Sequence, residues 1–224
     1  GHKGWIGNMY EQECVDNNID YYHSDYRAES SEMKKDILDK KATHVLCCMG
    51  RTHGTYKDKT YTTIDYLEHK DILPLNINDN LYAPMSLALF CEKMNIHFTY
   101  IGTGCIYEYD DTHPIHSGIG FKETDSPNFS GSNYSIVKGF TNNLMIHTNS
   151  LHLRIRMPIT NKQNTRNFIT KITTYEKICS MPNSMTVLTE LIPLSIQMMM
   201  NNETGTFNFT NPGTISHNEI LEMY

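Results

Sequence analysis

The sequence of 224 residues contains no apolar run that approaches the roughly 18 residues needed to cross a bilayer. Positive charge is also scarce, because 19 Lys and Arg stand against 25 Asp and Glu, for a formal net charge of -6. Nucleic-acid phosphates are bound by clustered Lys and Arg, so this balance argues against a nucleic-acid partner. We therefore expect neither a membrane nor a nucleic acid among the partners.

Metal sites and disulfides are not predicted either. The six cysteines show no metal-ligand spacing, and the adjacent pair Cys47 and Cys48 lies in an apolar run typical of a buried strand. Free thiols of this kind fit a reducing compartment best, which favours the cytoplasm. The cysteines are Cys14, Cys47, Cys48, Cys91, Cys105 and Cys179.

What the sequence does contain is an alternation of strand-like and helix-like segments. It predicts a Rossmann-type α/β fold, with a doubly wound parallel sheet covered by helices on both faces. The alternation weakens after residue 157, so we expect a Rossmann-type nucleotide-binding core over 1–157 and a smaller lobe over 158–224, suited to binding a substrate. Strands are expected at 19–22, 44–49, 96–101, 151–155 and 205–210, and helices near 5–15, 31–41, 80–94, 132–147, 168–175, 189–201 and from 216 onward.

A glycine-spaced loop opens the chain, with Gly1, Gly4 and Gly7 in the pattern G-x-x-G-x-x-G. Such glycines permit a tight turn and a close approach of backbone N–H groups to a pyrophosphate, with Trp5 and Ile6 inside the same turn. A phosphate loop normally follows a strand, so we expect a first strand of the sheet before residue 1. The last predicted helix stops after two turns, and we expect it to continue past residue 224.

The segment after the predicted 19–22 strand can select the cofactor. An arginine there can bind the 2′-phosphate of NADP, whereas a carboxylate favours NAD. Both Asp25 and Arg27 are present. We favour NADPH through Arg27, with a surface arginine as the alternative.

Tyr134 and Lys138 are the clearest candidates for chemistry. Residues four apart share one face of a helix, so the ammonium can lie near the phenol and lower its pKa. Such a tyrosine can protonate a ketone oxygen while a hydride reaches the carbon. Thr103 and Cys105 end a predicted strand, where side chains face the ligand crevice of a parallel sheet. Thr103 can hold the same oxygen, and Cys105 either packs or moves a proton beside the ketone.

With these motifs in place, the sequence resembles the extended short-chain dehydrogenase/reductases that act on deoxysugar nucleotides. Within them it is most similar to the bifunctional 3,5-epimerase/4-reductases that make UDP-L-rhamnose in plants and some giant viruses. The segments that carry the resemblance cover nearly the whole chain. They are 1–7, 103–109, 116–123, 126–132, 154–158, 166–171, 208–213 and 216–224.

The resemblance implies a nucleotide-sugar substrate, UDP-4-keto-6-deoxyglucose, which is epimerised at C3 and C5 and then reduced at C4 by NADPH. Tyr134, Lys138 and Thr103 match the reductase triad, and Lys138 also matches the residue that binds the nicotinamide ribose. Cys105 and Lys171 match the acid and base proposed for epimerisation. Single-function reductases of similar fold carry a tyrosine at the position of Cys105, so this residue favours two activities over one. Further matches are Gly50 and Asn80 beside the cofactor, and Arg166 and Asn167 beside the sugar nucleotide.

Two departures and two alternatives accompany this interpretation. The family's usual Asn-Ala-Ala-Gly is Cys47-Cys-Met-Gly50 here, and its Asn-Val-Val-Gly is Asn80-Leu-Tyr-Ala83. A single-function 4-reductase with a structural Cys105 is one alternative, and a non-catalytic nucleotide-binding regulatory subunit is the other. The oligomeric state stays open, with a homodimer among the alternatives.

Overall fold

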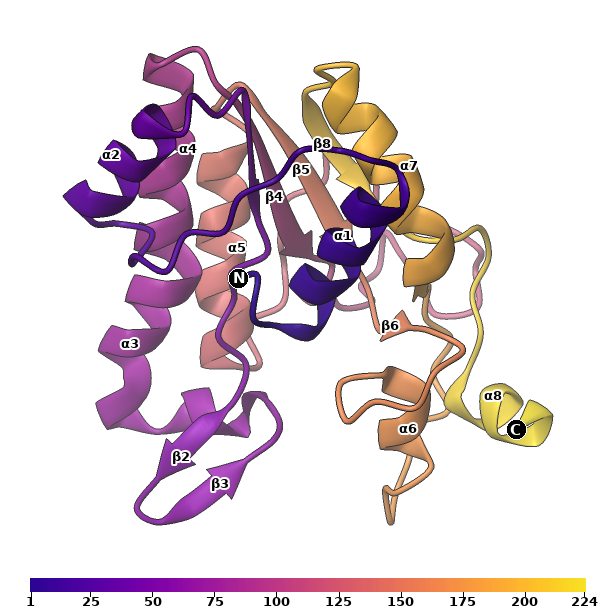
Figure 1. Ribbon diagram of the computed structural model, residues 1–224. Coiled ribbons are helices and arrows are strands. Elements are labelled where there is room, and N and C mark those ends of the chain that lie inside the picture. The colour runs from indigo at the N-terminus through magenta and orange to yellow at the C-terminus, as the bar shows by residue number, and fades with distance from the viewer.

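The computed structural model describes residues 1–224 and has a four-stranded parallel sheet at its centre (Figure 1). Every neighbouring pair in this sheet is parallel, and the strand order is β1-β4-β5-β8. The strands are β1 (His44–Cys47), β4 (His97–Thr103), β5 (Ser150–Ile155) and β8 (Gly205–Asn208).

Helices cover both faces of the sheet, as the alternating pattern predicts. On one face, Phe98 and Tyr100 of β4 pack into an apolar cluster with residues of α2, α4 and α5. On the other face, Leu151 and Leu153 of β5 pack with residues of α1 and α7. These helices are α1 (Trp5–Asp16), α2 (Ser31–Asp39), α4 (Ala83–Lys93), α5 (Asn133–Met145) and α7 (Leu188–Met200). The doubly wound α/β prediction is confirmed.

Local capping explains where several helices begin. The Ser132 side chain accepts a hydrogen bond from the Ser135 backbone at the start of α5. Ser216 and Glu219 form a capping box at the start of α8 (His217–Met223), the helix predicted from residue 216 onward. The start of α1 is different, because Gly4 is its N-cap and no side chain occupies the first N–H groups.

Two expectations for the first half of the chain are wrong. Residues 19–22 are not a strand: they have no ladder partner, and the side chains of Tyr21 and Tyr22 are exposed. Because a strand needs a neighbour to complete its hydrogen bonds, the apolar pattern alone does not produce one here. Residues 51–78, where the sequence predicts neither a strand nor a helix, form a hairpin and several helical turns. These are β2 (Gly54–Tyr56), β3 (Lys59–Tyr61), two 3₁₀ turns (Ile64–Glu68 and Lys70–Ile72), α3 (Leu73–Ile77) and a π-helical turn (Asn78–Tyr82) that leads into α4.

The second half of the chain also differs from the expected division at residue 157. Residues 158–224 are not one continuous lobe, because α7 and β8 return to the central sheet. The parts outside the sheet are the parallel pair β6 (Pro158–Ile159) and β7 (Thr186–Val187), with α6 (Phe168–Ile172) and α8. In Figure 1 α6 and α8 lie below the sheet, and the β2–β3 hairpin also lies below it but to their left. None of the helices combines the length and apolar character needed to cross a bilayer.

The close packing of Gly102 against His152 can be tested by adding a methyl group at residue 102. A Cβ at this position of β4 would overlap Nε2 of His152, whose side chain is buried beneath it. Gly102→Ala should therefore lower the free energy of unfolding by about 1–3 kcal/mol, the usual cost of overpacking. Urea denaturation measures this loss. Gly120→Ala is the matched control, because a Cβ there meets nothing within 4 Å. Equal stability of the two variants would contradict the packing described.

Candidate functional site

The first turn of α1 leaves its backbone N–H groups available to a ligand. A Cβ on Gly1 would lie 2.5 Å from the carbonyl carbon of Cys48, and one on Gly7 would overlap the carbonyl oxygen of Gly1. Glycines therefore let the loop pack against the end of β1 and against its own helix. Trp5 and Ile6 turn their side chains into the apolar cluster under α1. The uncapped, partly positive helix start suits a pyrophosphate.

A groove of about 680 Å³ extends from this loop along β1. Its walls come from the glycine loop, residues 22–29, α2, β1 and the loop that follows β1. Arg27 lines the groove, and its side chain is 58% exposed. The groove therefore joins the phosphate loop to the residue expected to select the cofactor.

Arg27 does not act alone. Its Nη2 donates to Oδ1 of Asp79 at 2.7 Å and its Nε donates to Glu29 at 2.6 Å. Asp79 also accepts from Nε of Arg51 at 2.5 Å, so one carboxylate holds two arginines at the groove. Sequence reasoning missed Arg51, although its place directly after Gly50 was a usable signal. Asp25, the carboxylate that would favour NAD, pairs instead with Lys3 at 2.6 Å.

Gly50, Asn80 and Lys138 lie together at the end of β1, as expected for residues beside one cofactor. A Cβ on Gly50 would lie 3.6 Å from Oδ1 of Asn80 and 3.7 Å from Nζ of Lys138. The fully buried Asn80 side chain accepts from the backbone N–H of Arg51 and donates to its carbonyl, both at 2.9 Å. The Thr141 hydroxyl donates to the Asn80 carbonyl at 2.6 Å, which ties the π-helical turn that contains Asn80 to α5.

Tyr134, Thr103 and Cys105 also come together. The Tyr134 phenol is buried, and burial raises its pKa. The nearby Thr103 side chain and the positive charge of Arg156 act in the opposite direction and lower this pKa. The Thr103 hydroxyl also accepts from the Cys105 backbone N–H at 3.0 Å, and Cys105 packs against the cluster that contains Tyr134.

The expected effect of Lys138 on Tyr134 is not present in this structure. Nζ of Lys138 lies 6.0 Å from the centre of the Tyr134 ring and donates instead to the hydroxyl of Tyr100. The cation that lowers the Tyr134 pKa is Arg156, which sequence reasoning missed. It follows the end of β5, its Nη2 donates to Asn183 at 2.8 Å, and its side chain lies against Gly104.

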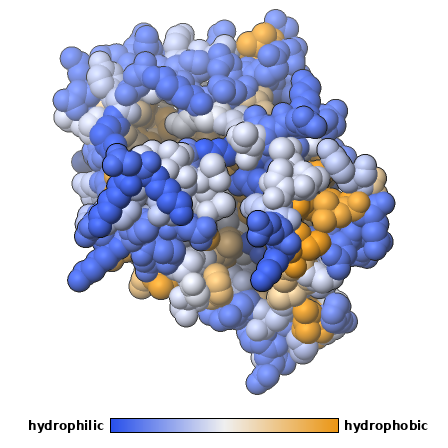
Figure 2. All heavy atoms as spheres, turned by 90° about the horizontal axis from the view of Figure 1, so that it is seen from below, coloured by the Kyte–Doolittle hydropathy of each residue, from blue (hydrophilic) through white to orange (hydrophobic).

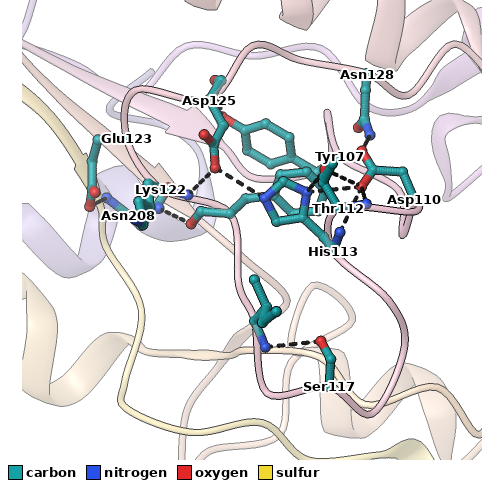
Figure 3. A network of polar contacts seen from close by, with 12 residues as sticks. Tyr107, Asp110, Thr112, His113, Ser117, Lys122, Glu123, Asp125, Asn128 and Asn208 are labelled. Carbon is teal, nitrogen blue, oxygen red and sulfur yellow. Dashed lines mark hydrogen bonds and ion pairs between the residues drawn. The ribbon is translucent and has the colours of Figure 1, made fainter.

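The long loop after β4, which starts with Gly104 and contains Cys105, is fixed by polar contacts and stacked rings (Figure 3). The ring of His113 lies between two carboxylates, 2.9 Å from Asp110 and 3.4 Å from Asp125. The Phe121 ring stacks on His113 and on Tyr107, with centroids 3.9 and 4.5 Å apart.

Two residues of the central sheet hold the far end of this loop. Nη2 of the buried Arg154 donates to the Glu123 carbonyl at 3.1 Å. Asn208 donates its side-chain N–H to the Phe121 carbonyl at 2.8 Å, and its backbone N–H to the Glu123 carboxylate at 2.9 Å. The loop is therefore anchored to β5 and β8 through Phe121 and Glu123.

Three predicted substrate-side residues lie in or next to α6, with different outcomes. Lys171 is half-buried, and burial together with Arg166 lowers its pKa. Nη1 of Arg166 donates to the Thr62 carbonyl at 3.4 Å, which links the α6 segment to the hairpin side. Asn167 is 2% exposed, and its side chain is used within its own loop: it caps α6 and donates to the Thr160 and Lys162 carbonyls. It therefore shapes the start of α6, and the expected direct substrate contact is not supported.

His53 is a further residue that sequence reasoning missed. Burial lowers its pKa, and so do the charges of Arg166, Arg51 and Lys171. His53 therefore lies close enough to three basic side chains for their charges to act on it. Figure 2 shows the molecule from below, with a recessed centre surrounded mostly by hydrophilic atoms and an apolar patch to one side. Such a set of cations suits a ligand that carries phosphate groups.

Three known proteins illustrate what this chain is similar to. The crystal structure of the L780 UDP-rhamnose synthase from Acanthamoeba polyphaga mimivirus is 50% identical and has a TM-score of 0.93, with 100% of this chain and 77% of that chain covered. A bifunctional dTDP-4-dehydrorhamnose 3,5-epimerase/dTDP-4-dehydrorhamnose reductase from Arabidopsis thaliana is 43% identical, with 100% of this chain and 72% of that protein covered. A dTDP-4-dehydrorhamnose reductase from Bacillus anthracis, solved with NADP, has a TM-score of 0.73 at 18% identity, with 96% and 74% covered. No protein-family model matches the sequence.

Arg27 generates a prediction about cofactor choice. Arg27→Ala should lower the ratio of catalytic efficiency with NADPH to that with NADH, because a charge-assisted contact to the 2′-phosphate is lost. The loss should be about 1–3 kcal/mol. Steady-state kinetics with both cofactors measures it, and Lys93→Ala on α4 controls for the loss of a positive charge. An unchanged ratio would show that Arg27 does not select the cofactor.

Proposed function

Because the chain belongs to the family of nucleotide-rhamnose 3,5-epimerase/4-reductases, we propose that it converts UDP-4-keto-6-deoxyglucose to UDP-L-rhamnose. The substrate would be epimerised at C3 and C5 and then reduced at C4 with NADPH. The observation that carries this proposal is the grouping of Thr103, Cys105 and Tyr134 at the carboxyl end of β4 and the start of α5.

The residues present fit a dinucleotide cofactor. The glycine loop leaves free N–H groups at the start of α1, and Arg27 and Arg51, both paired with Asp79, line the groove beside it. Lys138 lies beside Gly50, where it would bind the nicotinamide ribose. When bound, NADPH supplies the hydride for C4.

Reduction needs one proton and a means of holding the C4 oxygen. The Thr103 hydroxyl would hold this oxygen, and Tyr134 would donate the proton to it. Negative charge develops on the oxygen, and Arg156 is the cation placed to stabilise it through Tyr134. The raised pKa of Tyr134 keeps the phenol protonated before the reaction, so the proton is available.

Epimerisation uses the same ketone. The C4 carbonyl makes the protons at C3 and C5 acidic, and inversion requires a proton acceptor and a proton donor on opposite faces of the ring. Cys105 follows β4, and Lys171 lies on α6, a separate segment of the structure. The lowered pKa of Lys171 increases its neutral fraction at neutral pH, which suits proton transfer. We assign the two exchanges to this pair.

These residues distinguish the proposed function from two alternative functions. A single-function 4-reductase needs Tyr134 and Thr103 but leaves Cys105 as a packing residue. A non-catalytic nucleotide-binding subunit needs neither the buried phenol of Tyr134 nor the hydroxyl of Thr103. The complete Tyr134, Thr103 and Lys138 set favours an enzyme over a pure binding protein.

Replacing Tyr134 tests the reductase half. Tyr134→Phe should abolish reduction at C4 while cofactor binding stays nearly intact, because only the transferable proton is lost. NADPH oxidation followed by absorbance, together with a binding titration, measures both properties. Reduction within a few-fold of the wild type would remove Tyr134 from the acid role.

Replacing Cys105 tests the epimerase half. Cys105→Ser should suppress solvent deuterium incorporation at C3 and C5, because a serine hydroxyl is far less acidic than a thiol of pKa about 8.5. A general acid–base contribution is typically about 10²–10⁴-fold. The exchange is measured by NMR or mass spectrometry of the keto sugar in D₂O, and Lys171→Ala should give a similar loss.

The control for this experiment is reduction of a pre-epimerised 4-keto sugar, which should persist in Cys105→Ser because Tyr134, Thr103 and Lys138 are unchanged. If the variant exchanges both protons at the wild-type rate, the thiol is a packing group. The single-function reductase then becomes the better description.

A further inference from the structure

Lys138 is buried against a row of three side chains that crosses the central sheet. In the strand register Cys47 of β1 is paired with Tyr100 of β4, and Tyr100 is paired with His152 of β5. The rings of Tyr100 and His152 stack, with centroids 5.5 Å apart. Each of the three is at most 4% exposed.

The ammonium of Lys138 lies between this row and Gly50, in the loop that follows β1. Nζ of Lys138 donates to the Tyr100 hydroxyl and lies 4.8 Å from the centre of that ring. On its other side Nζ is 3.7 Å from the place of a Cβ on Gly50. The lysine side chain is 5% exposed, so water does not replace these contacts.

No carboxylate pairs with this buried charge. The titratable groups that face Lys138 are Cys47 on β1, Tyr100 on β4, His152 on β5 and Tyr134 on its own helix. Burial raises the pKa of Cys47 and of Tyr100, and it lowers the pKa of His152 to about 3, so these three groups are neutral at neutral pH. Burial also lowers the pKa of Lys138 to about 8. The ammonium therefore depends on neutral acceptors, and the Tyr100 hydroxyl is the one that it contacts.

We propose that Tyr100 is a positioning residue, whose buried hydroxyl holds the charged Lys138 against Gly50, ready for the cofactor ribose. The cofactor half of this role rests on the proposed function. A phenylalanine at this position would keep the ring and remove the acceptor. The ammonium would then lose its proton more readily or leave its place beside Gly50.

A double-mutant cycle on the cofactor-free protein tests the contact directly. At pH 7, Tyr100→Phe should raise the unfolding equilibrium constant roughly tenfold or more, because a buried charge loses its hydrogen bond. In a Lys138→Met background the same change should have little effect or stabilise, because no charge is left without an acceptor. The difference between the backgrounds should shrink as the pH rises through about 8, where Lys138 loses its charge.

Tyr10→Phe is the matched control. Tyr10 is also a buried tyrosine, and its hydroxyl lies 2.6 Å from Oγ of Ser195, remote from Lys138 in the α1–α7 cluster. This control variant should lose the same amount of stability in the wild-type background and in the Lys138→Met background. An equal loss for Tyr100→Phe in both backgrounds would overturn the proposal, since its hydroxyl would then act without Lys138.

Cofactor binding supplies the second readout. A fluorescence titration of NADPH should show roughly tenfold weaker binding to Tyr100→Phe and unchanged binding to Tyr10→Phe. If the wild type binds NADPH and Tyr100→Phe binds it equally well, the positioning role is wrong. If the wild type does not bind NADPH, the proposed function fails, and the cycle on the cofactor-free protein still decides whether Tyr100 holds Lys138.

Discussion

The arrangement of the site depends on one constraint, the parallel direction of the four central strands. Parallel strands end at the same edge of a sheet, so residues distant in sequence meet there. The loop after β1 brings Gly50 and Arg51, the end of β4 brings Thr103 and Cys105, and β5 leads into Arg156. Helix α5 then places Tyr134 and Lys138 over the same edge. This geometry brings residues from four separate segments to one edge of the sheet, where the proposed function assigns them to a cofactor groove and an acid–base cluster.

Burial determines how these groups can work. The Tyr134 phenol is kept protonated by burial, while Lys138 and Lys171 each have a lowered pKa for the same reason. These two lysines have different proposed roles: Lys138 would be held by Tyr100 beside Gly50, and Lys171 on α6 would exchange a proton. The backbone N–H of Cys105 is bonded to the Thr103 hydroxyl, and the loop that follows is anchored to β5 and β8. Reduction and epimerisation would therefore act on one ketone.

The sequence predicted the architecture because its strand and helix periods are clear and its helix starts carry recognisable caps, such as Ser132 and Ser216. It failed at residues 19–22, because pairing depends on a neighbouring strand and not on apolar pattern alone. The sequence also could not show whether Asn167 caps a helix or binds the substrate, because the same side-chain amide can serve either role. The contact between Tyr100 and Lys138 depends on the register of β1, β4 and β5, which no local pattern encodes.

The central claim is that one site performs both epimerisation and reduction. The most direct measurement incubates the full-length protein with UDP-4-keto-6-deoxyglucose and NADPH in D₂O and identifies the product sugar. We expect UDP-L-rhamnose with deuterium at C3 and C5 and hydride from NADPH at C4. A product reduced at C4 with unchanged configuration and no deuterium at C3 and C5 would contradict the claim.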